Sequence, residues 1–119
     1  SDFKMDKISI KMEGTGNGNL KNNDIKDLNI EINGKSNMEV EGKVEKLSAY
    51  VDGIGSLKAF GLEAENGDIK LNGIGSVEVN VEKKLSAEVN GIGKIIYKGN
   101  PSLEKTKLNG LGQIKKYEE

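Results

Sequence analysis

The glycine-rich segment Gly14-Thr-Gly-Asn-Gly18 is the first feature of the sequence with residues suited to chemistry. Backbone amides of such segments cradle phosphate groups when a Gly-x-Gly-x-x-Gly pattern links a strand to a helix. That pattern does not occur in this sequence. Glycine is also the residue that adopts backbone angles at tight corners that other residues avoid. We therefore interpret these glycines as corners of the fold and predict no phosphate site.

Paired carboxylates at positions i and i+2 are the second candidate: Glu39 with Glu41, and Glu63 with Glu65. On a β-strand this spacing puts both side chains on one face, about 7 Å apart. Two carboxyl groups at such a separation serve as acid and base in some glycoside hydrolases. Lysines accompany both pairs, however, and a mixed charged face keeps a repeat protein soluble. We therefore predict no catalytic residue and no enzymatic activity.

A row of amide and carboxylate side chains is the third candidate, because a polar residue stands directly before most of the recurring Gly-x-Gly corners. The row comprises Asn33, Asp52, Asn72, Asn90 and Asn109. Read functionally, such a row binds a sugar or an ion. Read structurally, stacked side-chain amides hydrogen-bond to one another, and Asn-Gly is favourable turn chemistry. We favour the structural interpretation.

Composition excludes several other kinds of site. The 119 residues include no cysteine and no histidine, which excludes disulfides, thiol nucleophiles, imidazole catalysis and the usual zinc sites. The 18 basic residues, all lysines, are balanced by 19 acidic ones, so the excess positive charge that binds nucleic acid is missing. No apolar run approaches the roughly 20 residues that span a bilayer. We predict no cofactor, no metal, no nucleic-acid partner and no membrane insertion by this segment.

An internal repeat indicates how these residues are positioned. Gly-Ile-Gly occurs at 53–55, 73–75 and 91–93, and Gly-Leu-Gly at 110–112; the same step backwards reaches Gly34 and Gly14. Six units of about 19 residues account for the chain, which we predict to be a single domain over 1–119. The units lie near 8–24, 25–43, 44–61, 62–81, 82–101 and 102–117.

Apolar columns appear when the units are aligned on the first glycine of each corner. They stand two, four and six residues before the glycine and four and six after it. The column two before the glycine comprises Met12, Ile32, Val51, Leu71, Val89 and Leu108. This spacing of two is the period of a β-strand, and identical corners at a constant step favour stacked coils over a hairpin meander. We predict an all-β fold, a single-stranded right-handed parallel β-helix (β-solenoid) of about six coils.

The middle residue of the later corners is a large aliphatic one: Ile54, Ile74, Ile92 and Leu111. Counting by twos from the core columns places these four side chains outside, as a continuous ridge. The alternative is that the unusual backbone angles of the glycines reset the alternation and turn the side chains into the core. If the ridge is real, we expect it to pack against a second copy of the domain or another part of the protein.

Three segments carry a resemblance to a known family: Leu-Ser-Ala-Glu-Val-Asn-Gly-Ile-Gly-Lys (85–94), Tyr-Lys-Gly-Asn-Pro (97–101) and Leu-Asn-Gly-Leu-Gly-Gln-Ile-Lys-Lys (108–116). They resemble the putative auto-transporter adhesin, head GIN domain family, over roughly residues 28–117. The family usually has serine in the middle of the corner, where this chain has Ile or Leu. The resemblance implies a β-helix and a bacterial exported setting, whether extracellular, cell-surface or periplasmic. It implies no catalytic residues.

Two functions from different classes follow. The first is a non-enzymatic, adhesin-like binding module that recognises an unknown protein or glycan ligand. The second is a structural domain, either a spacer or an oligomerisation unit that associates through the corner ridge and has no ligand of its own.

Overall fold

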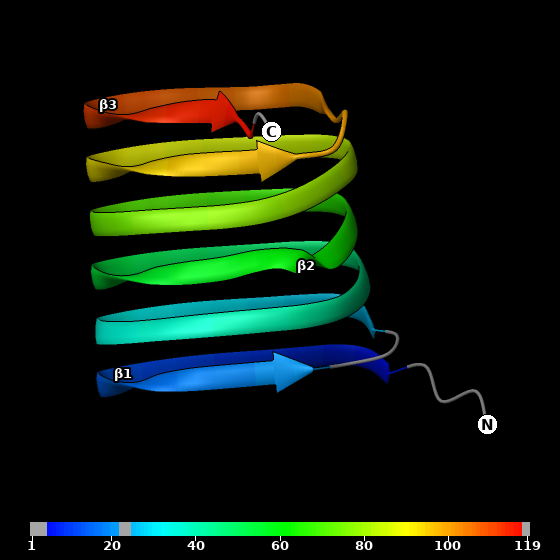
Figure 1. Cartoon of the computed structure of the whole chain (residues 1–119), viewed down its shortest axis with the longest axis horizontal. Coiled ribbons are helices and arrows are strands. Elements are labelled where there is room, and N and C mark those ends of the chain that lie inside the picture. Colours follow the sequence, from blue (N-terminus) through cyan, green and yellow to red (C-terminus); the bar gives the residue numbers. More distant parts are fainter. Residues whose placement is uncertain (1–4, 22–24, 118–119) are drawn as a thin grey trace.

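In the computed structural model, which describes residues 5–21 and 25–117, the chain winds into stacked coils of β-structure. Strand β1 covers Met5–Lys21, β2 covers Ile25–Lys98 and β3 covers Ser102–Lys116. They form one parallel sheet in the order β1-β2-β3, and β2 alone continues through several coils without interruption (Figure 1). The end of the first predicted unit, residues 22–24, lies outside the described residues.

The register of the coils follows the glycine corners. Gly14 pairs with Gly34, and Gly91 pairs with Gly110, so equivalent residues of neighbouring coils lie side by side. The six corner glycines from Gly14 to Gly110 form one column, in which each packs on the backbone of the one before it. Five turns of 18 to 20 residues connect these corners. The predicted parallel β-solenoid is therefore confirmed.

The predicted apolar columns fill the interior of the solenoid. Val79 and Val89, in the middle coils, are completely buried, as the alternation predicts. Alanines at positions 49, 59 and 87 are buried as well, in columns that hold isoleucine or valine in other coils. The core is less protected at its ends, where Ile8 of the first coil is only partly buried and Leu108 of the last is 48% exposed.

A second turn, which the sequence analysis did not identify, closes each coil on the opposite side. It includes Gly42 and Gly99, which have positive φ angles of 133° and 92° and stand eight residues after a corner glycine. Next to this turn, Val44, Leu62 and Val81 point inward and are buried. The core thus reaches from one turn to the other.

The last coil, β3, closes the solenoid at one end. Thr106 and Lys116 lie opposite Ala87 and Tyr97 in core columns of this coil and are exposed, because no further coil covers them. Counting by twos also places Glu104 in a core column, but this is wrong: a register shift pairs Leu103 with Leu85, and Glu104 has no partner in the ladder. The amide of Tyr117 donates to the carbonyl oxygen of Tyr97 at 2.8 Å, which continues the parallel ladder one residue beyond β3. No helix long and apolar enough to cross a bilayer occurs in the residues that the structure describes.

Candidate binding surfaces

The four large side chains of the corner ridge lie outside the core. Ile54 is 48% exposed, Ile74 49%, Ile92 52% and Leu111 72%. The outward orientation is therefore confirmed, and the alternative, in which the glycines turn these side chains inward, is wrong. In the first two coils the same position holds Thr15 and Lys35, so the apolar ridge is confined to the last four corners. The interaction of this ridge with a partner stays a prediction.

The second glycine of a corner faces the interior, because a Cβ at Gly93 would lie 2.8 Å from the buried side chain of Leu71. The position of the second glycine is taken by Ser36 in the second coil, where the side chain is 3% exposed. Its hydroxyl donates to the carbonyl oxygen of Gly14 at 3.4 Å. The middle residue stands directly before this inward position and faces out, as for Ile74.

The asparagine row forms a hydrogen-bonded ladder along one side of the corners. Asn90 donates from Nδ2 to Oδ1 of Asn72 at 2.8 Å, and Asn109 donates to Oδ1 of Asn90 at 2.8 Å. Asn72 in turn donates to the hydroxyl oxygen of Tyr50 at 2.8 Å. The structural interpretation is confirmed for these three asparagines. In an earlier coil, Asn33 binds Glu31 of its own coil instead, at 2.7 Å.

The carboxylate pairs lie on a charged face. Glu63 and Glu65 border a cavity of about 530 Å³ near the second turn. Oε1 of Glu65 lies 2.9 Å from Nζ of Lys83, and the hydrogen bond and charge of Glu65 raise the pKa of that lysine. In the other pair, Glu41 lies 3.9 Å from Nζ of Lys21. Within the described part of the chain, no three acidic side chains are arranged to hold a metal ion.

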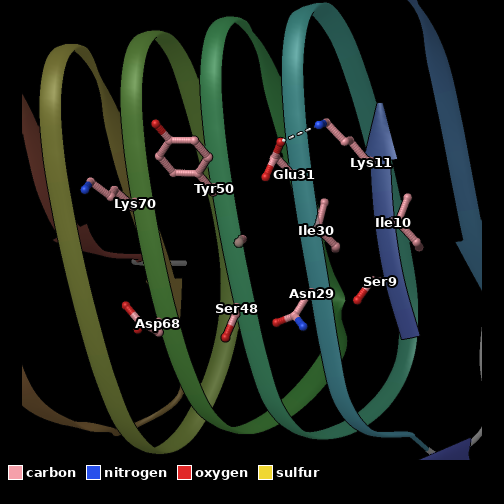
Figure 2. A pocket seen from close by; sticks show the side chains of 11 residues that line it. Ser9, Ile10, Lys11, Asn29, Ile30, Glu31, Ser48, Tyr50, Asp68 and Lys70 are labelled. Atoms are coloured by element: carbon pink, nitrogen blue, oxygen red, sulfur yellow. Dashed lines mark ion pairs between the residues drawn. The ribbon is translucent and has the colours of Figure 1, made fainter. Parts of the chain in front are cut away.

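A groove of about 560 Å³ lies on the arm before the corner. Two rows of side chains border it, and each row takes one residue from each of four successive coils (Figure 2). Five residues before the corner glycine stand short polar side chains: Ser9, Asn29, Ser48 and Asp68. Three residues before it stand longer ones: Lys11, Glu31, Tyr50 and Lys70. The backbone of the buried column between the two rows forms the floor.

Charges along the longer row are compensated by their neighbours. Nζ of Lys11 lies 3.5 Å from Oε2 of Glu31, and Nζ of Lys70 lies 3.7 Å from Oε2 of Glu88 in the next coil. The pKa of Glu88 is lowered, first by the hydrogen bond from Asn90 and then by Lys70. Nζ of Lys70 also lies 5.9 Å from the ring centroid of Tyr50. The sequence analysis missed this groove, although its two rows are columns of the same alignment that predicted the core.

Comparisons with known proteins agree with the observed architecture. The model of the family described as putative auto-transporter adhesin, head GIN domain, matches residues 1–101. A putative adhesin from Bacteroides fragilis superimposes with a TM-score of 0.91 at 27% identity, covering 96% of this chain and 52% of that one. A putative adhesin from Parabacteroides merdae superimposes with a TM-score of 0.87 at 25% identity, covering 97% and 48%. The chain thus spans about half the length of these solved structures. None of the curated proteins matches it significantly.

Proposed function

This chain belongs to the putative auto-transporter adhesin, head GIN domain family, and on that basis we propose that it is a non-enzymatic binding module of an exported or surface-attached bacterial protein. The family description supports an extracellular, cell-surface or periplasmic location. The observation that carries the binding function is the groove, in which polar side chains of four successive coils are aligned on one face.

The outer surface suits recognition because its side chains are already held in place. The asparagine ladder and the ion pairs between neighbouring coils restrain side chains beside the groove, including Asn72, Lys70 and Glu31. A binding surface that is ordered before the ligand arrives loses less conformational entropy on association. The stacked coils also form a long face, which is the kind of surface that solenoid proteins use for binding.

A binding screen of the isolated 119-residue protein tests this function. The folded protein is applied to arrays of glycans and of extracellular matrix proteins, and the heat-unfolded protein serves as the control. We expect specific, saturable binding of the folded protein to members of at least one array. Absence of saturable binding to both arrays contradicts the proposed function.

Self-association is a second candidate, which the exposed ridge favours. Ile74, Ile92 and Leu111 border a shallow hollow of about 500 Å³, and soluble monomers seldom leave contiguous apolar strips of this kind uncovered. In this case the ridge of one copy packs against that of another, and the domain serves as an oligomerisation or spacer unit.

Light scattering of the Ile74→Ser, Ile92→Ser double variant tests self-association. We expect the native protein to form dimers or larger species and the double variant to be monomeric with an unchanged melting temperature, because both side chains are exposed. Thr15→Ser, at the same position of the first corner, is the matched control. A native protein that is monomeric at high concentration contradicts this candidate.

A further inference from the structure

We propose that the groove bordered by the rows five and three residues before the corner binds a linear, uncharged oligosaccharide that runs across the coils, with Tyr50 stacking on a sugar ring. The inference rests on the proposed binding function and assigns it a site and a class of ligand. It follows from the shape of the groove, its charge and the position of its aromatic ring.

The shape of the groove suits a linear ligand. Its rows cross successive coils, which are spaced about 4.8 Å apart, so similar side chains recur at a constant distance along its length. The short row presents hydroxyl, amide and carboxylate groups at Ser48, Asn29 and Asp68. Together they offer donors and acceptors, as the hydroxyl groups of a sugar require. Figure 2 shows these three side chains aligned along one side of the groove.

The charge of the groove favours an uncharged ligand. Its lining includes two lysines, Lys11 and Lys70, and two carboxylates, Glu31 and Asp68, so their charges cancel. Lys11 and Glu31 are paired with each other, and Lys70 lies beside Glu88. A polyanion needs an uncompensated cluster of cations to be concentrated at a surface. A ligand with many hydroxyl groups and no net charge does not need such a cluster of cations.

Tyr50 is positioned to act as the aromatic platform. Its hydroxyl oxygen accepts a hydrogen bond from Asn72 at 2.8 Å, and Nζ of Lys70 lies 5.9 Å from its ring centroid. These contacts hold the ring between Glu31 and Lys70 on the outer face (Figure 2). An aromatic ring with an apolar face and a polar edge combines stacking with hydrogen bonding.

The other aromatic side chains in the described part of the chain have different partners. The ring centroids of Phe60 and Tyr117 lie 5.1 Å apart, and Tyr97 packs against the hydrophobic core. Tyr50 is thus the described aromatic residue that borders the groove. This assignment singles out one side chain for the test.

Native gel electrophoresis through gels that contain a soluble polysaccharide measures the proposed binding. The probes are the neutral polysaccharides dextran, xylan and mannan and the anionic polygalacturonate. We expect at least one neutral polysaccharide to retard the native protein, with an affinity that changes little between about 50 and about 500 mM NaCl, because no ion pair forms. Tyr50→Ala is expected to weaken that affinity about tenfold or more.

Two control variants make the result specific. Tyr50→Phe keeps the ring and should retain most of the affinity, whereas Glu63→Ala, on the charged face near the second turn, should bind like the native protein. All variants are compared by circular dichroism and melting temperature, so that loss of binding is separated from loss of folding.

Retardation by polygalacturonate alone overturns the proposal, and so does retardation by a neutral polysaccharide that Tyr50→Ala does not change. Failure of all neutral probes overturns it as well. In each case, saturable binding in the array screen leaves the proposed function standing with a different site or ligand. If the protein binds neither in the array screen nor to a neutral polysaccharide, both the proposed site and the proposed binding function are contradicted.

Discussion

The two glycines of each corner meet two different structural requirements. The first glycine has a positive φ, 131° at Gly73, which side chains with a Cβ rarely adopt. The second glycine has no such φ at Gly75, but a Cβ there would overlap the carbonyl oxygen of Gly55 in the preceding coil. Glycine at position 75 is therefore required by the close approach of two backbones.

A matched pair of alanine substitutions tests the close approach. Gly75→Ala should lower the free energy of unfolding by about 1–3 kcal/mol, the usual cost of inserting an atom into a packed site. Gly16→Ala is the control, because a Cβ at this corner has no atom within 4 Å and φ is not in the left-handed region. It should change stability by less than about 0.5 kcal/mol. Equal effects in urea denaturation would contradict this account of the corner.

Glu88 provides a prediction about pH. Its pKa is lowered in the folded protein, mainly by the hydrogen bond from Asn90. A carboxyl group with a lowered folded-state pKa stabilises the fold at pH values above its unfolded pKa. This stabilisation is lost as the pH falls through the folded pKa, so it is absent in strong acid. We therefore expect Asn90→Ala to raise the titration midpoint of Glu88, measured by NMR of its side-chain carbon.

A smaller shift is expected for Lys70→Met, because Lys70 contributes less than the Asn90 hydrogen bond to the low pKa of Glu88. If the midpoint of Glu88 is the same in the native protein and in Asn90→Ala, the hydrogen bond between these side chains does not stabilise the charged carboxylate.

At the scale of the element, β3 protects the apolar end of the solenoid. Its residues pair in parallel with β2, where Val89 lies opposite Leu108. Tyr117, which follows β3, adds contacts to earlier coils, because its ring centroid lies 5.1 Å from that of Phe60 and 5.3 Å from Nζ of Lys98. β3 thus leaves its own Leu108 exposed while it covers the fully buried residues of the coil below.

Deletion of residues 103–119 tests this protective role. The truncation uncovers Leu85, Val89 and Ile95, which are completely buried in the full chain, and leaves the edge of the preceding coil unpaired. An uncovered apolar strand edge is a template for association with other chains. We expect the truncated protein to aggregate in size-exclusion chromatography and light scattering. A soluble truncation with a cooperative melting transition would show that β3 is not a cap.

At the scale of the whole molecule, burial changes along the solenoid axis. Core residues of the middle coils, such as Leu57 and Leu71, are completely buried, whereas Ile8 is partly buried in the first coil and Leu103 is 48% exposed in the last. Each coil contacts only its neighbours, so an end coil has one stabilising interface where a middle coil has two. Opening is therefore expected to begin at the ends.

Amide hydrogen exchange measures this gradient. We expect backbone amides in residues 47–81 to exchange at least about tenfold more slowly than those in 5–21 and 102–116, because local opening is easiest where buried contacts are fewest. The parallel ladder continues through all three ranges, so hydrogen bonding alone predicts no such difference. Uniform exchange over all three ranges would mean that the solenoid opens only as a single cooperative unit.

The solenoid, its core columns and the asparagine ladder could all be predicted from the amino-acid sequence. In stacked parallel coils, the neighbour of a residue is the equivalent residue of the next repeat, so a constant step in sequence predicts which side chains meet. The alternation within each repeat then predicts which of them are buried, as for Val79 and Val89. The contact of Asn90 with Asn72 follows from the same rule.

Features that depend on backbone angles or on contacts outside the repeat could be seen only in the folded chain. The alternation of apolar and polar residues allowed two orientations of the Ile74 side chain, inward and outward. The structure shows the outward one. The groove beside Tyr50 depends on the lengths of side chains in two adjacent rows, which a pattern of apolar and polar residues does not describe. The contact of Tyr117 with Phe60 joins residues that are not equivalent in the repeat, so its period carries no information about their meeting.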